Sequence, residues 1–237
     1  MKSSNKKQLW ILAGGNGAGK STFYKTRLEP LGMSFINADV LAQQHFPDEA
    51  EERSYEAAKI AETMRLDLLN EGRNFCFETV FSHPSKIDFI AKAKALGYEI
   101  ILVYIHLETV ALNQARVSQR VSEGGHHVPD EKVISRIPRV MQNIKQVFPL
   151  CDVSYVLDNS RLDNPFQQVA VIKQGLIEFT IEPLPTWATG LLSDYLKWFL
   201  ILTKNVVCPC LIRIRFGGIW SWFYEVIKQT SSKCIHA

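Results

Sequence analysis

The sequence lacks the features that mark fibrous, low-complexity, secreted or membrane-spanning proteins. Its 237 residues include only 10 prolines and 13 glycines, which excludes collagen-like and low-complexity chains. Charged residues interrupt its apolar C-terminal segment well short of the ~18 residues that a transmembrane helix needs. No apolar stretch of about 7 to 15 residues, as in a secretory signal, follows the polar N-terminus. We therefore expect a cytoplasmic globular protein without a transmembrane segment.

Cysteine is also scarce, and the five cysteines do not have the spacing of a disulfide framework. Such scattered cysteines are typical of a reducing compartment. One residue separates Cys208 from Cys210, whereas redox and zinc pairs are separated by two. We expect neither a disulfide nor a bound metal at this pair.

The net charge of +3 is unevenly distributed along the chain. After Tyr195, six basic residues stand against one acid, so the last 42 residues carry +5 and the first 195 carry −2. A basic patch for nucleic acid is therefore not expected in the main part of the chain. The change in composition predicts one domain over residues 1–195 and a basic, aromatic-rich extension over residues 196–237 that does not fold independently.

Short apolar runs alternate with amphipathic segments through the first 181 residues. Strands are predicted at 8–13, 34–37, from 75, 99–107 and 153–157, helices at 49–70, 84–96, 109–121 and 129–147, and a hairpin at 169–181. In the first of these helices, Ile60, Met64 and Leu68 are predicted to form the buried face. This alternation is typical of an α/β fold with a mainly parallel sheet and helices on both faces.

A Gly-rich motif directly follows the first predicted strand and precedes a helical stretch. The sequence GGNGAGKS matches GxxxxGK[ST], the P-loop or Walker A motif that binds nucleotide triphosphates. Lys20 is expected to reach the β and γ phosphates, and the Ser21 hydroxyl to ligate Mg²⁺. The predicted ATP-binding residues are Gly14, Gly15, Asn16, Gly17, Ala18, Gly19, Lys20, Ser21 and Thr22. ATP and Mg²⁺ are the expected cofactors.

Acidic residues follow the second and third predicted strands. Asp39 lies at the carboxyl end of one strand, and Glu78 and Thr79 at the end of the next, which is the edge where parallel sheets bind ligands. Asp39 has two roles open to it: the base that accepts the proton of an attacking hydroxyl, or the cap of a helix beginning at Val40. His83 is interpreted as part of a helix start rather than as a catalytic residue.

Arginines cluster around a predicted hinge, Gly124-Gly125-His126-His127. Arg116 and Arg120 precede this hinge, and Arg136 and Arg139 follow it. Such arginines suit a helical lid that closes over the phosphates and neutralises charge on the transferred group. A solvated basic helix face is the alternative.

Taken together, these motifs resemble the zeta toxin family of P-loop kinases, in its bacterial chromosomal branch. The resemblance lies in GGNGAGKST, INAD, FETVFSHPSK and RVSEGGHHVPDEKVISRIPR, and extends over about residues 9–192. It implies a three-layer P-loop kinase fold with an arginine-bearing lid and a C-terminal β-hairpin. It also implies transfer of the ATP γ-phosphate to a sugar hydroxyl of UDP-N-acetylglucosamine, which blocks cell-wall precursor synthesis.

The same resemblance implies roles for individual residues. Asp39 becomes the catalytic base, Glu78 and Thr79 contact the amino sugar, and Arg120 and Arg136 are the transition-state arginines. The implied partners are a nucleotide-sugar substrate and an antitoxin protein. Two other interpretations stay open, namely a kinase of another hydroxylated molecule such as an antibiotic or nucleoside, and an inactive nucleotide-binding switch.

The extension after Tyr195 has no counterpart in the family pattern. It contains seven aromatic residues without a heptad or clear strand alternation. Read-through or frameshifted sequence, an amphipathic surface-binding segment and a partner-docking segment are the alternatives. We favour the first.

Overall fold

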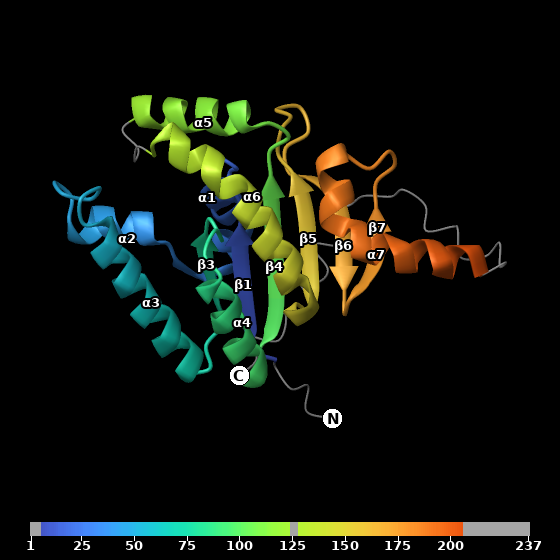
Figure 1. Ribbon diagram of the computed structural model, residues 1–237. Helices are drawn as coiled ribbons and strands as arrows, with labels where there is room; N and C mark the ends of the chain where they lie inside the picture. Colours follow the sequence, from blue (N-terminus) through green and yellow to red (C-terminus); the bar gives the residue numbers. More distant parts are fainter. Residues whose placement is uncertain (1–5, 124–127, 206–237) are drawn as a thin grey trace. The chain divides into compact units, whose positions relative to one another are not determined.

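The computed structural model describes residues 6–123 and 128–205 (Figure 1). The chain divides into two compact units, Met1–Lys197 and Trp198–Ala237. Helix α7 (Thr186–Asn205) continues through the boundary predicted after residue 195. The predicted extension thus begins within a helix, and most of it lies outside the described residues.

A seven-stranded sheet forms the centre of the larger unit, with the strand order β2-β3-β1-β4-β5-β6-β7. Its parallel strands are β1 (Gln8–Ala13), β2 (Ser34–Ile36), β3 (Phe75–Thr79), β4 (Glu99–His106) and β5 (Val153–Asp158). The predicted hairpin is present as β6 (Gln167–Lys173) and β7 (Leu176–Thr180), which pair antiparallel at one edge. The prediction of a mainly parallel sheet is confirmed.

Helices cover both faces of this sheet, which is why its central strands are apolar on both sides. In β1, Leu9, Ile11 and Ala13 belong to the main core cluster, and the alternate residues Trp10 and Leu12 are buried too. Figure 1 shows α4 (Ser85–Ala95) and α6 (Asp130–Val147) in front of the sheet and α1 (Lys20–Phe23) behind it. The predicted three-layer α/β architecture is therefore present.

The long helix α3 (Ser54–Asn70) begins five residues later than predicted and buries a different face. Of the predicted face, Ile60 and Leu68 are partly buried and pack against the core, but Met64 is 38% exposed. The prediction considered only large apolar residues. It therefore missed two alanines, whose small side chains let this helix approach its neighbours closely. The fully buried row consists of Ala57, Ala61, Arg65 and Leu69. An arginine therefore lies in the row that faces the core.

The remaining helices complete the layers. Helix α2 (Ala38–His45), for which no range was predicted, packs on α3. Helix α5 (Val110–Ser122) packs on α6, and both lie close to their predicted ranges. Short helical turns at Tyr24–Leu28 and Glu29–Leu31 continue α1, and one at Phe148–Leu150 continues α6. The predicted hinge at 124–127 lies outside the described residues. Within the part of the chain that the structure describes, no helix is long and apolar enough to cross a membrane.

Candidate phosphate-binding and catalytic site

The P-loop joins β1 to α1 and lies tightly against the neighbouring strands. Gly14 has φ +152°, and a Cβ atom added there would lie 2.2 Å from the Ile105 carbonyl oxygen at the end of β4. Gly19 has φ +97°, and a Cβ atom there would lie 2.5 Å from Asn159 Nδ2. No side chain fits either position without movement, so the motif's glycines follow from the close approach of the backbone.

Two asparagines that the sequence analysis did not select hold this loop. Asn113 Nδ2 donates to the Asn16 carbonyl at 2.6 Å, and Asn159 Nδ2 donates to the Ala18 carbonyl at 2.9 Å. Both asparagines are buried. Each satisfies a loop carbonyl that the local turn leaves without a helix or sheet partner.

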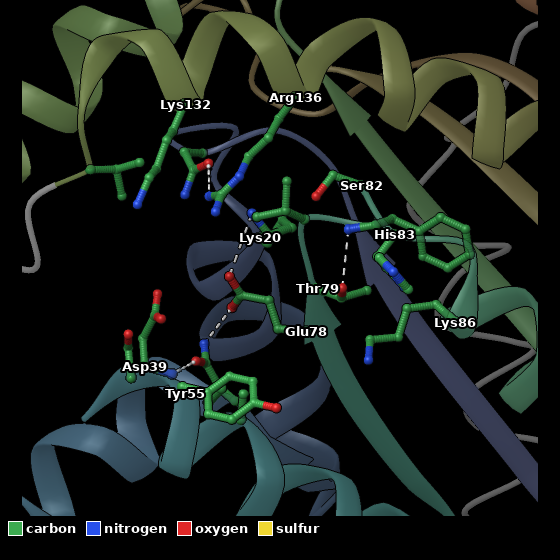
Figure 2. A pocket seen from close by; sticks show the side chains of 18 of the residues that line it. Lys20, Asp39, Tyr55, Glu78, Thr79, Ser82, His83, Lys86, Lys132 and Arg136 are labelled. Carbon is green, nitrogen blue, oxygen red and sulfur yellow. Dashed lines mark hydrogen bonds and ion pairs between the residues drawn. The ribbon is translucent and has the colours of Figure 1, made fainter. Parts of the chain in front are cut away.

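Lys20, Ser21 and Glu78 form a compact polar cluster behind the P-loop. Lys20 Nζ donates to the Gly15 carbonyl at 3.0 Å and lies 3.6 Å from Glu78 Oε1. The Ser21 hydroxyl donates to Glu78 Oε2 at 2.6 Å, and Asn37 Nδ2 donates to the same oxygen at 2.8 Å. Glu78 is opposite Leu12 in the β1–β3 register, which places its carboxylate at the carboxyl end of the sheet. Figure 2 shows the ion pair between Lys20 and Glu78 as a dashed line.

Asp39 lies in the first turn of α2, and its side chain is exposed to the same pocket. The helix cap is Asn37, whose Oδ1 accepts from the backbone N–H groups of Asp39 and Val40 at 2.8 and 3.3 Å. The alternative that Asp39 caps a helix beginning at Val40 was therefore wrong, because α2 begins at Ala38 and its cap is already supplied. The carboxylate of Asp39 is left to face the pocket (Figure 2).

Thr79 also lines the pocket, but its hydroxyl accepts a hydrogen bond from the Phe81 backbone N–H at 3.0 Å. Phe81 is buried and has φ +65°, and its carbonyl accepts from Asn143 Nδ2 at 2.9 Å. Thr79 thus helps to hold a tight turn after β3. His83 accepts from the Ser85 backbone N–H at 3.2 Å at the start of α4, which agrees with its interpretation as a helix-start residue.

The structure separates the four lid arginines into two pairs. Arg120 on α5 and Arg136 on α6 line the pocket, and Arg136 donates to Asn16 Oδ1 at 3.2 Å. Arg116 instead donates to the Asn159 carbonyl at 2.8 Å, and burial lowers its pKa while Asp158 opposes this shift. Arg139 is exposed and bonds within its own helix to Ser135. Only one arginine from each helix is therefore positioned to meet a ligand in the pocket.

The cavity has a volume of about 610 Å³, and its lining includes Lys20, Asp39, Glu78, Thr79, Arg120 and Arg136. Among the described residues that line it, the cationic side chains outnumber the carboxylates by six to three. The cations are Lys20, Arg65, Lys86, Arg120, Lys132 and Arg136, and the carboxylates are Asp39, Glu51 and Glu78. Such an excess of positive charge suits phosphorylated ligands.

Comparison with known proteins identifies the family. A profile of the AAA domain family matches residues 9–144, more than half of the chain. This protein belongs to the AAA domain family. An uncharacterized protein of Haemophilus influenzae (strain ATCC 51907 / DSM 11121 / KW20 / Rd) is 28% identical over 135 residues, which cover 54% of this chain and 96% of that protein.

Solved structures share the fold of this chain. A chain of the PezAT chromosomal toxin–antitoxin system of Streptococcus pneumoniae aligns with a TM-score of 0.56 at 15% identity, covering all of this chain and 90% of that one. The AvrRxo1-ORF1:-ORF2 complex aligns with a TM-score of 0.62 at 18% identity, covering 95% and 76%. The same complex with ATP aligns with a TM-score of 0.60 at 17% identity, covering 96% and 76%.

The AAA domain match contains most, but not all, of the site. It includes the P-loop, Asp39, Glu78 and the two arginines that line the pocket, but it ends before Asn159. Asn159 comes directly after β5, at the same sheet edge as the other polar groups. That position, one residue past a buried strand, was the signal available in the sequence.

Proposed function

We propose that this protein is an ATP-dependent kinase that transfers the γ-phosphate to a hydroxyl group of a small molecule. One observation supports this most strongly: Lys20, Glu78 and the carboxylate of Asp39 line one pocket, and Ser21 is hydrogen-bonded to Glu78 beside it. A phosphate-binding loop and a base on the same cavity are what phosphoryl transfer needs, because the reaction depends on positioning and charge stabilisation.

In this proposal the P-loop binds the phosphates of ATP. Backbone N–H groups of Gly15 to Ser21 surround the phosphates, and the Lys20 ammonium neutralises their charge. Lys20 is 6% exposed and already oriented by the Gly15 carbonyl and Glu78. Little side-chain entropy is therefore lost when the nucleotide binds.

The residues around Ser21 also fit Mg²⁺. The Ser21 hydroxyl and a Glu78 carboxylate oxygen are 2.6 Å apart beside the P-loop, and both are hard oxygen ligands. Mg²⁺ in kinases is held by one or two such groups together with phosphate oxygens. When bound, the ion would neutralise charge on the phosphates, with Ser21 as its direct ligand and Glu78 beside it.

Asp39 is the proposed base. A carboxylate at this position accepts the proton of the acceptor hydroxyl as its oxygen attacks the γ-phosphorus. Arg120 and Arg136, from the two lid helices, stabilise the charge that spreads over the transferred group. The hydrogen bond from Arg136 to Asn16 ties this arginine to the P-loop.

We further propose UDP-N-acetylglucosamine as the acceptor, with Glu78 and Thr79 near its amino sugar. The motif resemblance to zeta toxins supports this substrate, as does the fold shared with a chain of the PezAT toxin–antitoxin system. The same likeness motivates an antitoxin protein as partner. Toxicity in cells follows only where the phosphorylated product blocks synthesis of the cell wall.

The base assignment is tested by Asp39→Asn. Transfer from ATP to UDP-N-acetylglucosamine should fall by at least about 10²-fold, the usual contribution of a positioned base. ATP binding, measured by calorimetry, should stay near the wild-type value, because Asp39 makes no hydrogen bond to the P-loop among the contacts that the structure describes.

Asp48→Asn is the matched control, since Asp48 is exposed and does not line the pocket among its described residues. Its transfer rate should equal that of the wild type. Undiminished transfer by Asp39→Asn would overturn the base assignment.

A further inference from the structure

Arg65 is a buried cation that lines the pocket. Its side chain is 6% exposed in the inward row of α3, and it lines the cavity. The guanidinium carbon lies 5.3 Å from the ring centre of Phe77 and 5.7 Å from that of Phe89. Two aromatic faces thus stabilise the cation without using its hydrogen-bond donors.

The polar atoms of Arg65 are poorly satisfied within the protein. Its Nε atom is buried and has no hydrogen-bond partner. Among the described residues, no carboxylate forms an ion pair with it, and exposed Glu62 is the acid whose charge acts on it. Buried donors of this kind normally have a partner, because an unpaired one costs about 1–3 kcal/mol. Arg65 therefore has binding capacity that the folded chain does not use.

A second cation lies beside it. Lys86, in the first turn of α4, is half-buried and lines the same cavity. Burial lowers its pKa, and so does the neighbouring charge of Arg65, while Glu62 opposes the shift. Figure 2 shows Lys86 reaching from α4 into the pocket on the side of Thr79 and His83. Two adjacent cations that repel each other in a pocket are arranged for an anionic ligand.

We propose that Arg65 and Lys86 form an anion subsite that binds a phosphate or diphosphate group carried by the acceptor. The inference rests on the proposed kinase function, and it names the class of acceptor. The P-loop holds the phosphates of the donor at one end of the cavity. The subsite holds a phosphate of the acceptor at the other end, so that a hydroxyl between them lies near Asp39.

This arrangement excludes neutral sugars and nucleosides as efficient acceptors. A neutral molecule would leave the Arg65 donors unpaired in the closed pocket, and a site built to bind a polar group discriminates strongly against ligands that lack it. A phosphorylated alcohol or a nucleotide sugar supplies the missing acceptor atoms. Arg65 and Lys86 are then specificity-determining residues rather than catalytic ones.

The subsite can be tested by binding alone. The P-loop is first saturated with magnesium and the non-hydrolysable analogue AMP-PNP, and inorganic pyrophosphate is then titrated by calorimetry with magnesium in excess. The wild-type protein should bind pyrophosphate at a second site. Arg65→Met and Lys86→Met should each weaken that binding by about tenfold or more, the effect of losing one charge-assisted hydrogen bond.

Lys92→Met is the matched control, because Lys92 is an exposed lysine of the same helix outside the described pocket lining. Its pyrophosphate affinity should equal that of the wild type. Thermal unfolding checks that each variant is folded. If Arg65→Met does not fold, the test relies on Lys86→Met alone. Absence of a second site in the wild type, or unchanged affinity in Lys86→Met, would overturn the proposal.

Transfer kinetics separate this inference from the proposed function. With UDP-N-acetylglucosamine as acceptor, Lys86→Met should raise KM by about tenfold and change kcat little, since the subsite supplies binding rather than chemistry. N-acetylglucosamine should be a poor acceptor for the wild type. If the wild type binds pyrophosphate at a second site but transfers no phosphate, the proposed kinase function is refuted and the proposed subsite stands. If Lys86→Met transfers phosphate with the wild-type KM, the proposed subsite is refuted and the proposed kinase function stands.

Discussion

Lys20 and Arg65 show two ways in which one pocket accommodates a buried cation. Lys20 has a carboxylate and a carbonyl as neighbours, whereas Arg65 has two aromatic rings and an unpaired donor. Lys20 could be predicted because its motif has a fixed geometry. Arg65 could not, because a helical pattern assigns charged residues to the solvent face, and only the fold shows that position 65 faces inward.

His106 is another buried polar residue, and its burial leads to a prediction about the pH dependence of stability. It ends β4, where Tyr104 Oη lies 2.9 Å from its Nδ1 and the ring of Trp187 packs on it with ring centres 4.2 Å apart. Burial lowers the pKa of His106 to about 4, and Asp158 opposes this shift only in part. The native state therefore keeps a neutral imidazole at pH values where the unfolded chain is already protonated.

Stability should consequently fall as the pH falls from about 6.5 towards 4. In this window the unfolded state binds a proton that the native state does not, which lowers the free energy of unfolding by up to about 1.4 kcal/mol per pH unit. Above pH 6.5 the contribution is fully present. The measurement is urea unfolding across this range for the wild type and for His106→Gln.

The difference between the two proteins isolates His106, because titrating carboxylates contribute equally to both. The wild type should lose more stability than His106→Gln between pH 6.5 and 4. Parallel curves over this range would contradict the assignment of a neutral buried imidazole.

At the scale of elements, side chains from helix α5 and from the loop after β5 hold the P-loop in place. Asn113 on α5 and Asn159 after β5 fix its carbonyl groups, and the close approach of β4 explains Gly14. The motif, its strand and its helix could be predicted from local sequence. The asparagines were missed, because each contact joins residues far apart in the chain. The position of Asn159 after a strand was its one signal, and asparagine there is common in turns.

Replacing Asn159 by alanine should loosen the P-loop. The variant loses the bond to the Ala18 carbonyl and the one that Asn159 Oδ1 accepts from the Phe166 backbone N–H at 3.2 Å. We expect weaker ATP binding by about tenfold and a lower free energy of unfolding by about 1–3 kcal/mol, because buried backbone groups lose their partners.

Asn164→Ala is the control for this change, since Asn164 is exposed in the same loop. Its ATP affinity and thermal midpoint should match the wild type. If Asn159→Ala binds ATP with unchanged affinity, the loop does not depend on this contact.

At the scale of the whole molecule, the alternation of apolar runs predicted the architecture of the sheet and its helices better than the buried face of each helix. The parallel strands, the helices on both faces and the terminal hairpin agree with the structure. The inward face of α3 was predicted only in part: Ile60 and Leu68 pack against the core, but the pattern did not recognise Ala57 and Ala61 as core residues. Composition predicted a change after residue 195, and this position lies inside α7, where Leu191 and Leu192 belong to the core and Leu196 packs against it.

In the proposed function, this pocket transfers the γ-phosphate of ATP to a phosphorylated alcohol. The most direct measurement incubates the protein with Mg-ATP and a mixed pool of nucleotide sugars, free sugars and nucleosides, and identifies the products by mass spectrometry. Lys20→Met serves as the control that retains the fold but loses the phosphate contact.

We predict that the wild type adds one phosphoryl group to UDP-N-acetylglucosamine, on a sugar hydroxyl, and that Lys20→Met adds none. Free sugars and nucleosides should stay unmodified. ATP binding without any phosphorylated product, or phosphorylation confined to neutral acceptors, would contradict the account.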